Sequence, residues 1–132
     1  MARTLCRLLG FVLLLAGAAG FAEPHLLGLH LTSIHNVIHV LSGLALIYVG
    51  FAASLEAARG TSLVFGSVYF LLGLLGFVAP GVVSTVLGHA LALDAKSLLP
   101  DNLLHLVLGG AFLFAGLAQP THGTVSVTRP NL

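Results

Sequence analysis

Charged side chains divide this chain into long apolar stretches. The five basic and four acidic residues leave uncharged runs at 8–22, 24–55, 60–93 and 102–128. A helix that crosses the hydrocarbon core of a bilayer needs about 20 mainly apolar residues, so each run has room for one such helix. We therefore predict an all-α membrane protein, a bundle with spans over residues 4–22, 34–54, 62–79 and 102–118.

The composition favours lipid as the solvent. Of the 132 residues, 58% are hydrophobic and only 7% are charged. A globule of this size has too much surface for its volume to hide so many apolar residues from water, whereas a bilayer solvates them directly. Because the net charge is +1 and no basic cluster is present, nothing indicates a nucleic-acid partner.

The second half of the chain repeats the first. Residues 10–24 align with 66–80, and residues 36–50 align with 102–116. The matched positions are Gly10, Gly17 and Gly20 with Gly66, Gly73 and Gly76, and Asn36, His39, Gly43 and Gly50 with Asn102, His105, Gly109 and Gly116. This pattern predicts two copies of one helical hairpin, related by an approximate two-fold axis along the membrane normal.

The polar and small residues of the second and fourth spans share one helical face. In each span the intervals are three, four, three and four residues, which forms one stripe along the helix. The two stripes are Asn36, His39, Gly43, Leu46 and Gly50, and Asn102, His105, Gly109, Phe112 and Gly116. Polar side chains avoid acyl chains, and glycines allow close backbone approach. We therefore expect the two stripes to face each other in a central contact. The glycines of the first and third spans then pack around it, or alternatively serve a partner protein.

The basic residues predict the orientation. Arg3, Arg7, Arg59 and Arg129 all fall on one side of the predicted spans, which the positive-inside tendency makes cytoplasmic. Both termini are then cytoplasmic, and the connections 23–33 and 80–101 lie outside. A cleavable secretory signal is the rival interpretation of the N-terminus, but a removed segment has no reason to resemble a later span.

Two further segments complete a single transmembrane domain over residues 1–118. Residues 82–99 are apolar with polar side chains interspersed, which predicts a helix lying in the outer interface. Residues 119–132 contain two prolines and mostly polar residues, which is typical of a flexible tail. At the span starts, Asp101 and Ser33 are placed to cap the fourth and second helices.

His39 and His105 are the sharpest chemical feature. One interpretation is structural, with His39 bonded to Asn102 and His105 bonded to Asn36 across the two-fold axis. The other is that the two imidazoles are ligands of a haem, a chlorin or a transition metal. The remaining histidines His25, His30, His35 and His89 fall in the outside connections, at no spacing typical of a metal site.

Other chemistry finds little support in the sequence. Cys6 is the only cysteine, so an internal disulfide or paired-thiol redox site is excluded. No span carries a central carboxylate, lysine or arginine of the kind that a coupled exporter uses. No nucleophile is paired with a base at a recognisable spacing. We therefore expect a protein that is not an enzyme.

The motifs HNVIHVLSGLALIYVG, SLVFGSVYFLLGLLGFV and DNLLHLVLGGAFLFAG resemble the bacterial family of small four-span membrane proteins catalogued as domain of unknown function 4383. The resemblance covers residues 5–118 and implies a multi-pass protein of the bacterial cytoplasmic (inner) membrane. The chain is more distantly similar to the DoxX-type four-span proteins, some of which are linked to quinone-dependent redox systems. Neither resemblance implies catalytic residues.

The leading hypothesis for function is a non-enzymatic accessory subunit that packs against other membrane protein subunits in a larger complex. Small glycine-rich helices without a soluble domain indicate it. The alternative is an electron-transfer or pigment protein that holds a haem, chlorin or metal through His39 and His105.

Overall fold

The computed structural model describes residues 1–118, and these residues form helices and connections without a strand. The long helices are α1 (Ala2–Ala22), α2 (Ser33–Ala52), α3 (Leu55–Val78) and α5 (Leu99–Leu117), and the short elements are a 3-10 turn (Leu26–Gly28) and α4 (Pro80–Val86). Four helices of the described chain are long and apolar enough to cross a membrane. This confirms the all-α class and the number of spans. The tail predicted at 119–132 lies outside the described residues.

Hydroxyl side chains decide where two of the helices begin. The Thr32 hydroxyl accepts a hydrogen bond from the backbone N–H of His35 at 3.1 Å and so caps α2. Ser54 caps α3 in the same way, because its hydroxyl accepts from the Ala57 N–H at 3.1 Å. The expected cap Ser33 is instead the first helical residue. Because Ser54 starts a helix directly, α3 begins at Leu55 rather than at residue 62.

The helix expected over residues 82–99 is wrong in extent. After α4 ends at Val86, Gly88 takes a positive φ of 75°, which breaks the helix. Polar side chains then bond the backbone of the following turns: the Ser84 hydroxyl accepts from the Leu93 N–H at 2.9 Å, and Asp94 Oδ1 accepts from the Ser97 N–H at 2.7 Å. The segment is therefore a short helix followed by turns over residues 87–98.

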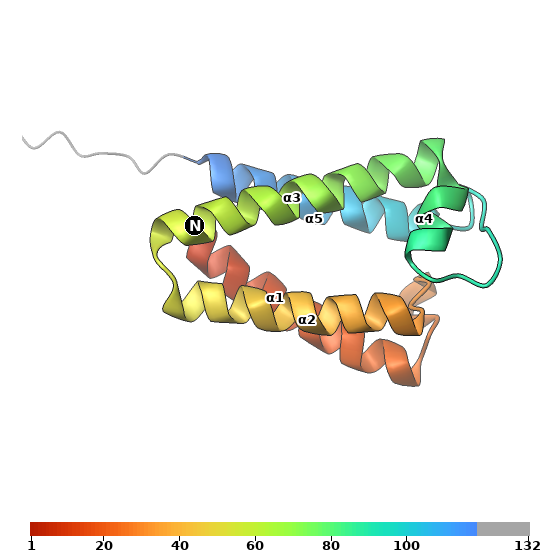
Figure 1. Ribbon diagram of the computed structural model, residues 1–132, viewed down its shortest axis with the longest axis horizontal. Helices are drawn as coiled ribbons and strands as arrows, with labels where there is room; N and C mark the ends of the chain where they lie inside the picture. The colour runs from red at the N-terminus through yellow and green to blue at the C-terminus, as the bar shows by residue number, and fades with distance from the viewer. Residues whose placement is uncertain (119–132) are drawn as a thin grey trace, which may run out of the picture.

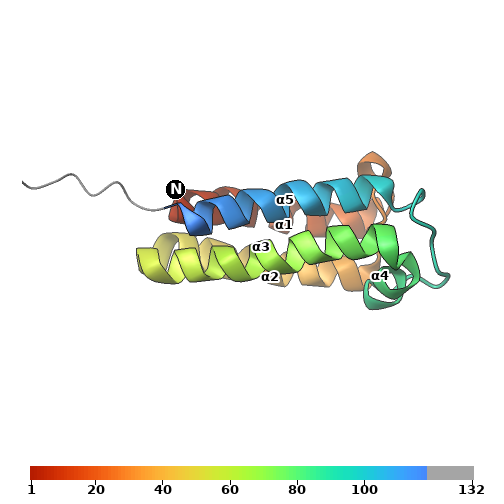
Figure 2. The same cartoon turned by 90° about the horizontal axis from the view of Figure 1, so that it is seen from above.

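The long helices form two antiparallel hairpins that lie side by side. Helix α1 packs along α2, and α3 packs along α5, while the contacts between the hairpins are fewer (Figure 1). Figure 2 shows the same pairs from above, with the N-terminus and the end of α5 at one end of the bundle. The other end carries the connections 23–32 and 79–98, and we call it the histidine end.

Glycines set the packing inside each hairpin. A Cβ on Gly43 would lie 2.7 Å from the Gly10 carbonyl oxygen and 2.7 Å from the Leu14 nitrogen, and a Cβ on Gly109 would collide with the Phe70 backbone. Each stripe of α2 or α5 therefore faces its own hairpin partner. The predicted central contact between the glycine stripes of α2 and α5 is wrong, because these glycines are instead the points at which α1 approaches α2 and α3 approaches α5 closely.

The two hairpins make matching contacts. A Cβ on Gly17 would meet the Asn36 carbonyl oxygen at 2.7 Å, as one on Gly73 would meet that of Asn102 at 2.9 Å. Gly20 lies against the Asn36 side chain, and Gly76 lies against the Asn102 side chain. At the opposite end, Arg3 Nε donates to the Gly50 carbonyl at 3.3 Å and Arg59 Nε donates to that of Gly116 at 3.1 Å. These arginines satisfy carbonyls that the ends of α2 and α5 leave unpaired.

Between the hairpins lies a buried cluster to which every long helix contributes. Leu13, Leu46, Tyr69 and Phe112 are all buried in it, one from each of the four helices. At the N-terminal end the hairpins also meet where Cys6 Sγ lies 3.6 Å from Ser62 Oγ. The core thus holds the hairpins together at the centre and at one end, and polar groups do so at the histidine end.

Candidate functional site

Three imidazoles come together between the hairpins at the histidine end. His35 and His39 lie on α2 with ring centroids 4.2 Å apart, and the His105 ring on α5 lies 5.8 Å from that of His35. Their exposed fractions are 2%, 7% and 8%, so all three are buried. His39 and His105 therefore line the same site. His35, which the sequence placed in an outside connection, lies in contact with both.

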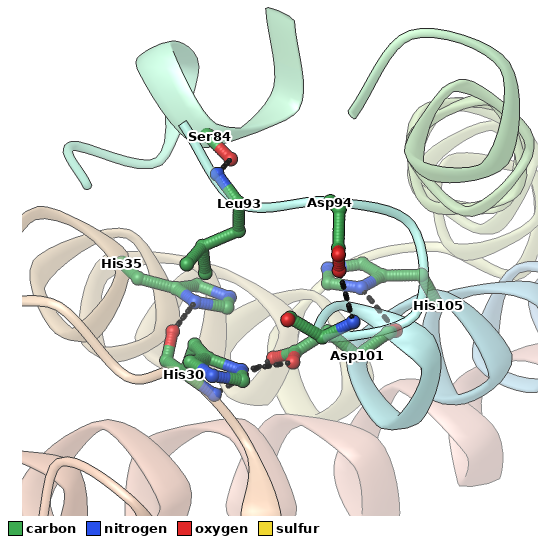
Figure 3. A network of polar contacts seen from close by, with 8 residues as sticks. His30, His35, Ser84, Leu93, Asp94, Asp101 and His105 are labelled. Carbon is green, nitrogen blue, oxygen red and sulfur yellow. Dashed lines mark hydrogen bonds and ion pairs between the residues drawn. The ribbon is translucent and has the colours of Figure 1, made fainter. Parts of the chain in front are cut away.

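Asp101 joins the two hairpins at this site (Figure 3). Its carboxylate, on the first turn of α5, accepts the backbone N–H of His30 and the Nδ1–H of the same histidine, both at 3.0 Å. Asp101 was expected to cap α5, but no side chain caps this helix. The carboxylate instead binds the connection between α1 and α2, and at 3% exposure it is itself buried.

His30 and Asp101 also orient two of the imidazoles. His35 Nδ1 lies 3.2 Å from the His30 carbonyl oxygen, and His105 Nδ1 lies 2.7 Å from the Asp101 carbonyl oxygen (Figure 3). A carbonyl oxygen only accepts hydrogen bonds, so each Nδ1 must carry the hydrogen. An unpaired buried charge is costly, so both rings are neutral. The Nε2 atoms of His35 and His105 are therefore unprotonated acceptors.

One of these acceptors, Nε2 of His35, is buried without a hydrogen-bond partner among the described residues. Nδ1 of His39 is likewise buried without a partner among them. Buried polar atoms in folded proteins are nearly always hydrogen-bonded, so such orphaned atoms call for an explanation. The rings that carry these atoms line empty space.

That space is a cavity of about 420 Å³. We call it the histidine chamber, and its walls are mainly apolar side chains of α2 and α3, with α4 at one edge. Its lining consists of His35, Ile38, His39, Ser42, Val64, Phe65, Val68, Tyr69, Leu72, Val86, Leu87 and His105. Val64, Val68 and Val86 are exposed on the outer flank, so the chamber opens sideways, where acyl chains surround a membrane-embedded bundle.

Behind the imidazoles lies a second, smaller cavity. It has a volume of about 70 Å³ and is lined from the opposite side by residues of α1 and α5, including Val12, Ala16 and Leu104. His35, His39 and His105 border both cavities. The imidazoles thus form a polar partition across an otherwise apolar interior.

The predicted bonds between histidines and asparagines do not form. Asn36 Nδ2 donates to the Leu31 carbonyl at 3.2 Å, and Asn102 Nδ2 has no partner among the described residues. Each asparagine is held against a glycine of its own hairpin, Gly20 or Gly76, which keeps it away from the opposite hairpin. The asparagine partners predicted for His39 and His105 are therefore wrong: His105 bonds the Asp101 carbonyl instead, and Nδ1 of His39 has no partner among the described residues.

The other histidines gather on the outside of the same end. The His30 ring contacts His25 and His89, with centroids 5.7 and 5.9 Å apart. Burial lowers the pKa of His89 below its ordinary value, and the neighbouring His30 ring lowers it further, whereas Asp101 opposes the shift. Within residues 1–118, no group of three or more histidine, cysteine, aspartate or glutamate side chains is arranged to hold a metal ion.

Sequence reasoning missed His35, His30 and Tyr69, whose ring lies 5.3 Å from that of His105. One signal was available, because His35 precedes His39 by four residues and Asp101 precedes His105 by four, which places each pair on one helical face. The link between His30 and Asp101 had no local signal, since these residues are 71 positions apart.

Comparison with protein-family models, curated proteins and solved structures finds no match to this chain. The resemblance to the family of unknown function and to the DoxX-type proteins therefore stays a prediction.

Proposed function

We propose that the chain is a non-enzymatic accessory subunit of a larger membrane complex. The observation that supports this most is the loose contact between the two hairpins, which leaves apolar grooves on the flanks of the bundle. In addition to the histidine chamber, a groove of about 370 Å³ runs between α1 and α5 at the opposite, N-terminal end of the bundle. Its lining is Met1, Thr4, Leu5, Leu8, Ala111, Phe114 and Ala115.

The shape of this groove suits a helix of another subunit. In lipid, helices associate through close packing rather than through hydrophobic drive, and small residues permit that packing. Ala111 and Ala115 are one helical turn apart on α5, and exposed Leu8 and Phe114 flank them.

The proposal also includes the duplication of the hairpin, the orientation of the bundle and the membrane in which it lies. Two equivalent hairpins, as the matching Asn36 and Asn102 contacts suggest, are consistent with a duplicated unit. Arg3, Arg7 and Arg59 lie together at the end that carries the N-terminus, which favours a cytoplasmic location for that end. The family resemblance supports a bacterial cytoplasmic membrane.

Co-purification from native membranes in a mild detergent tests the subunit role. The wild-type chain should migrate with other membrane proteins, and the variant Ala111→Phe, which fills the groove, should lose them. Val107→Phe is the matched control, because Val107 is an exposed position of α5 outside the groove lining. A wild-type chain that always migrates alone as a monomer would contradict the proposal.

The cofactor alternative is less well supported by the geometry. A haem or chlorin held between His39 and His105 would have to displace the buried His35 ring, which contacts both. The visible absorption spectrum of protein purified from a cofactor-replete host decides this alternative directly.

A further inference from the structure

The histidine chamber has the features of a binding site that the accessory role does not explain. Its apolar walls would be filled by side chains if the space served only packing, because protein interiors are close-packed. Instead, about 420 Å³ stays open beside buried imidazoles. His35 is 2% exposed, and its Nε2 has no hydrogen-bond partner among the described residues.

The hydrogen bonds at the back of the chamber determine what the His35 and His105 rings can bind. Because the carbonyls of His30 and Asp101 take the Nδ1–H groups of His35 and His105, these two rings offer only Nε2 lone pairs. A lone pair in an apolar cavity is satisfied by a molecule that donates a hydrogen. A ligand that offers only acceptors, such as an ether or an ester, would leave the nitrogens unpaired.

The walls and the opening define the rest of the ligand. The lining is almost entirely apolar, and Phe65 and Tyr69 contribute aromatic rings, of which that of Tyr69 lies beside His105. The chamber opens between α2 and α3, past exposed Val64 and Val68, so its ligand would enter from the bilayer. A charged molecule would lose its hydration there without gaining a partner of opposite charge.

We propose that the histidine chamber binds a neutral, membrane-soluble molecule with a flat apolar ring and a hydroxyl group, and that the hydroxyl donates to Nε2 of His105. The proposal is independent of the accessory role, since it needs no protein partner. No covalent or redox step is involved.

The test uses the full chain in phosphatidylcholine nanodiscs and compares 2-naphthol, whose hydroxyl is a hydrogen-bond donor, with its methyl ether 2-methoxynaphthalene, which has no donor. Binding is measured by naphthalene fluorescence, and empty nanodiscs correct for partitioning into lipid. 2-Naphthol should bind saturably with about tenfold higher affinity than its methyl ether, which is the factor expected for one hydrogen bond.

Two variants identify the acceptor while keeping the fold. In His105→Asn the side-chain amide can still donate to the Asp101 carbonyl at the position of Nδ1, but the group at Nε2 is gone. In His105→Gln the amide reaches the Nε2 position instead. His105→Asn should therefore reduce the preference for 2-naphthol to about onefold, and His105→Gln should keep it.

Three results would overturn the proposal. One is equal affinity of the wild-type chain for the two probes, and another is an absence of saturable 2-naphthol binding above empty nanodiscs. The third is a tightly bound haem or metal in the purified protein, since either would occupy the Nε2 atoms. All three are readable on the wild-type chain alone.

Discussion

The Asp101 carboxylate accepts two hydrogen bonds from His30, a residue 71 positions earlier on the other hairpin. The same aspartate accepts His105 Nδ1–H through its carbonyl, and the His30 carbonyl accepts His35 Nδ1–H. One pair of residues therefore joins the hairpins at the histidine end and also orients two imidazoles toward the histidine chamber. His30 and Asp101 thus contribute both to the fold and to the site.

Replacing Asp101 should weaken the histidine end of the bundle. In Asp101→Ala the partly buried N–H groups of His30 lose both acceptors, and leaving such groups unsatisfied costs about 1–3 kcal/mol of unfolding free energy when they are shielded from water. Thermal unfolding in detergent measures the loss. Asp94→Asn is the control, because Asp94 is an exposed carboxylate in the neighbouring connection, and it should leave the midpoint almost unchanged. Equal effects of the two variants would show that the carboxylate at 101 makes no special contact.

Adjacent glycines on α5 should differ sharply in their tolerance of a methyl group. In Gly109→Ala the new Cβ collides with the backbone of Phe70 on α3, and such overpacking costs about 1–3 kcal/mol. In Gly110→Ala the Cβ meets nothing within 4 Å. The unfolding midpoint should therefore drop only for Gly109→Ala. If Gly110→Ala were the more damaging variant, the pairing of α3 with α5 would be wrong.

The single native cysteine offers a direct probe of the contact between hairpins. Since Cys6 Sγ lies 3.6 Å from Ser62 Oγ, the variant Ser62→Cys should form an intramolecular disulfide with Cys6 under mild oxidation. The product is detected as a mobility shift on a non-reducing gel that disappears with reductant. Val64→Cys, at an exposed position on the same helix, should not produce it. Crosslinking of Val64→Cys but not of Ser62→Cys would place a different face of α3 against α1.

Stability should depend on pH through His89. Because burial lowers the pKa of this imidazole, the unfolded chain binds more protons than the folded one from the ordinary value of 6.5 down to the lowered pKa. The stabilising contribution is present above pH 6.5 and is lost as the pH falls below it. His89→Gln, which cannot titrate, should therefore lose less stability than the wild type between pH 7 and about pH 5. Identical pH profiles of the two proteins would contradict a half-buried His89 that is neutral in the folded chain.

The sequence predicted the features that depend on local pattern. Uncharged apolar runs predicted four spans, because span length follows directly from bilayer thickness. The small and polar stripes correctly marked buried faces at Asn36, Gly43, Asn102 and Gly109. Periodicity states which residues share a face, however, and not which helix that face contacts. The stripes therefore contact α1 and α3 rather than each other.

The site was predictable only in part for a similar reason. His39 and His105 were singled out because imidazoles are uncommon within spans, and both line the histidine chamber. The bonds that orient the imidazoles involve backbone carbonyls of His30 and Asp101, and backbone groups leave no trace in the residue pattern. The chamber itself arises from incomplete packing between two hairpins, which depends on the three-dimensional fit of many side chains.

The tautomers of His35 and His105 test the central claim most directly. The ¹⁵N spectrum of histidine-labelled protein in nanodiscs distinguishes a protonated ring nitrogen from an unprotonated one, and spectra of His35→Asn and His105→Asn assign the two rings. We predict a hydrogen on Nδ1 and a bare Nε2 in both rings of the ligand-free protein, with the His35 ring losing this preference if the His30–Asp101 link is removed by Asp101→Ala. Hydrogen on Nε2 of both rings in the wild-type chain would contradict the account.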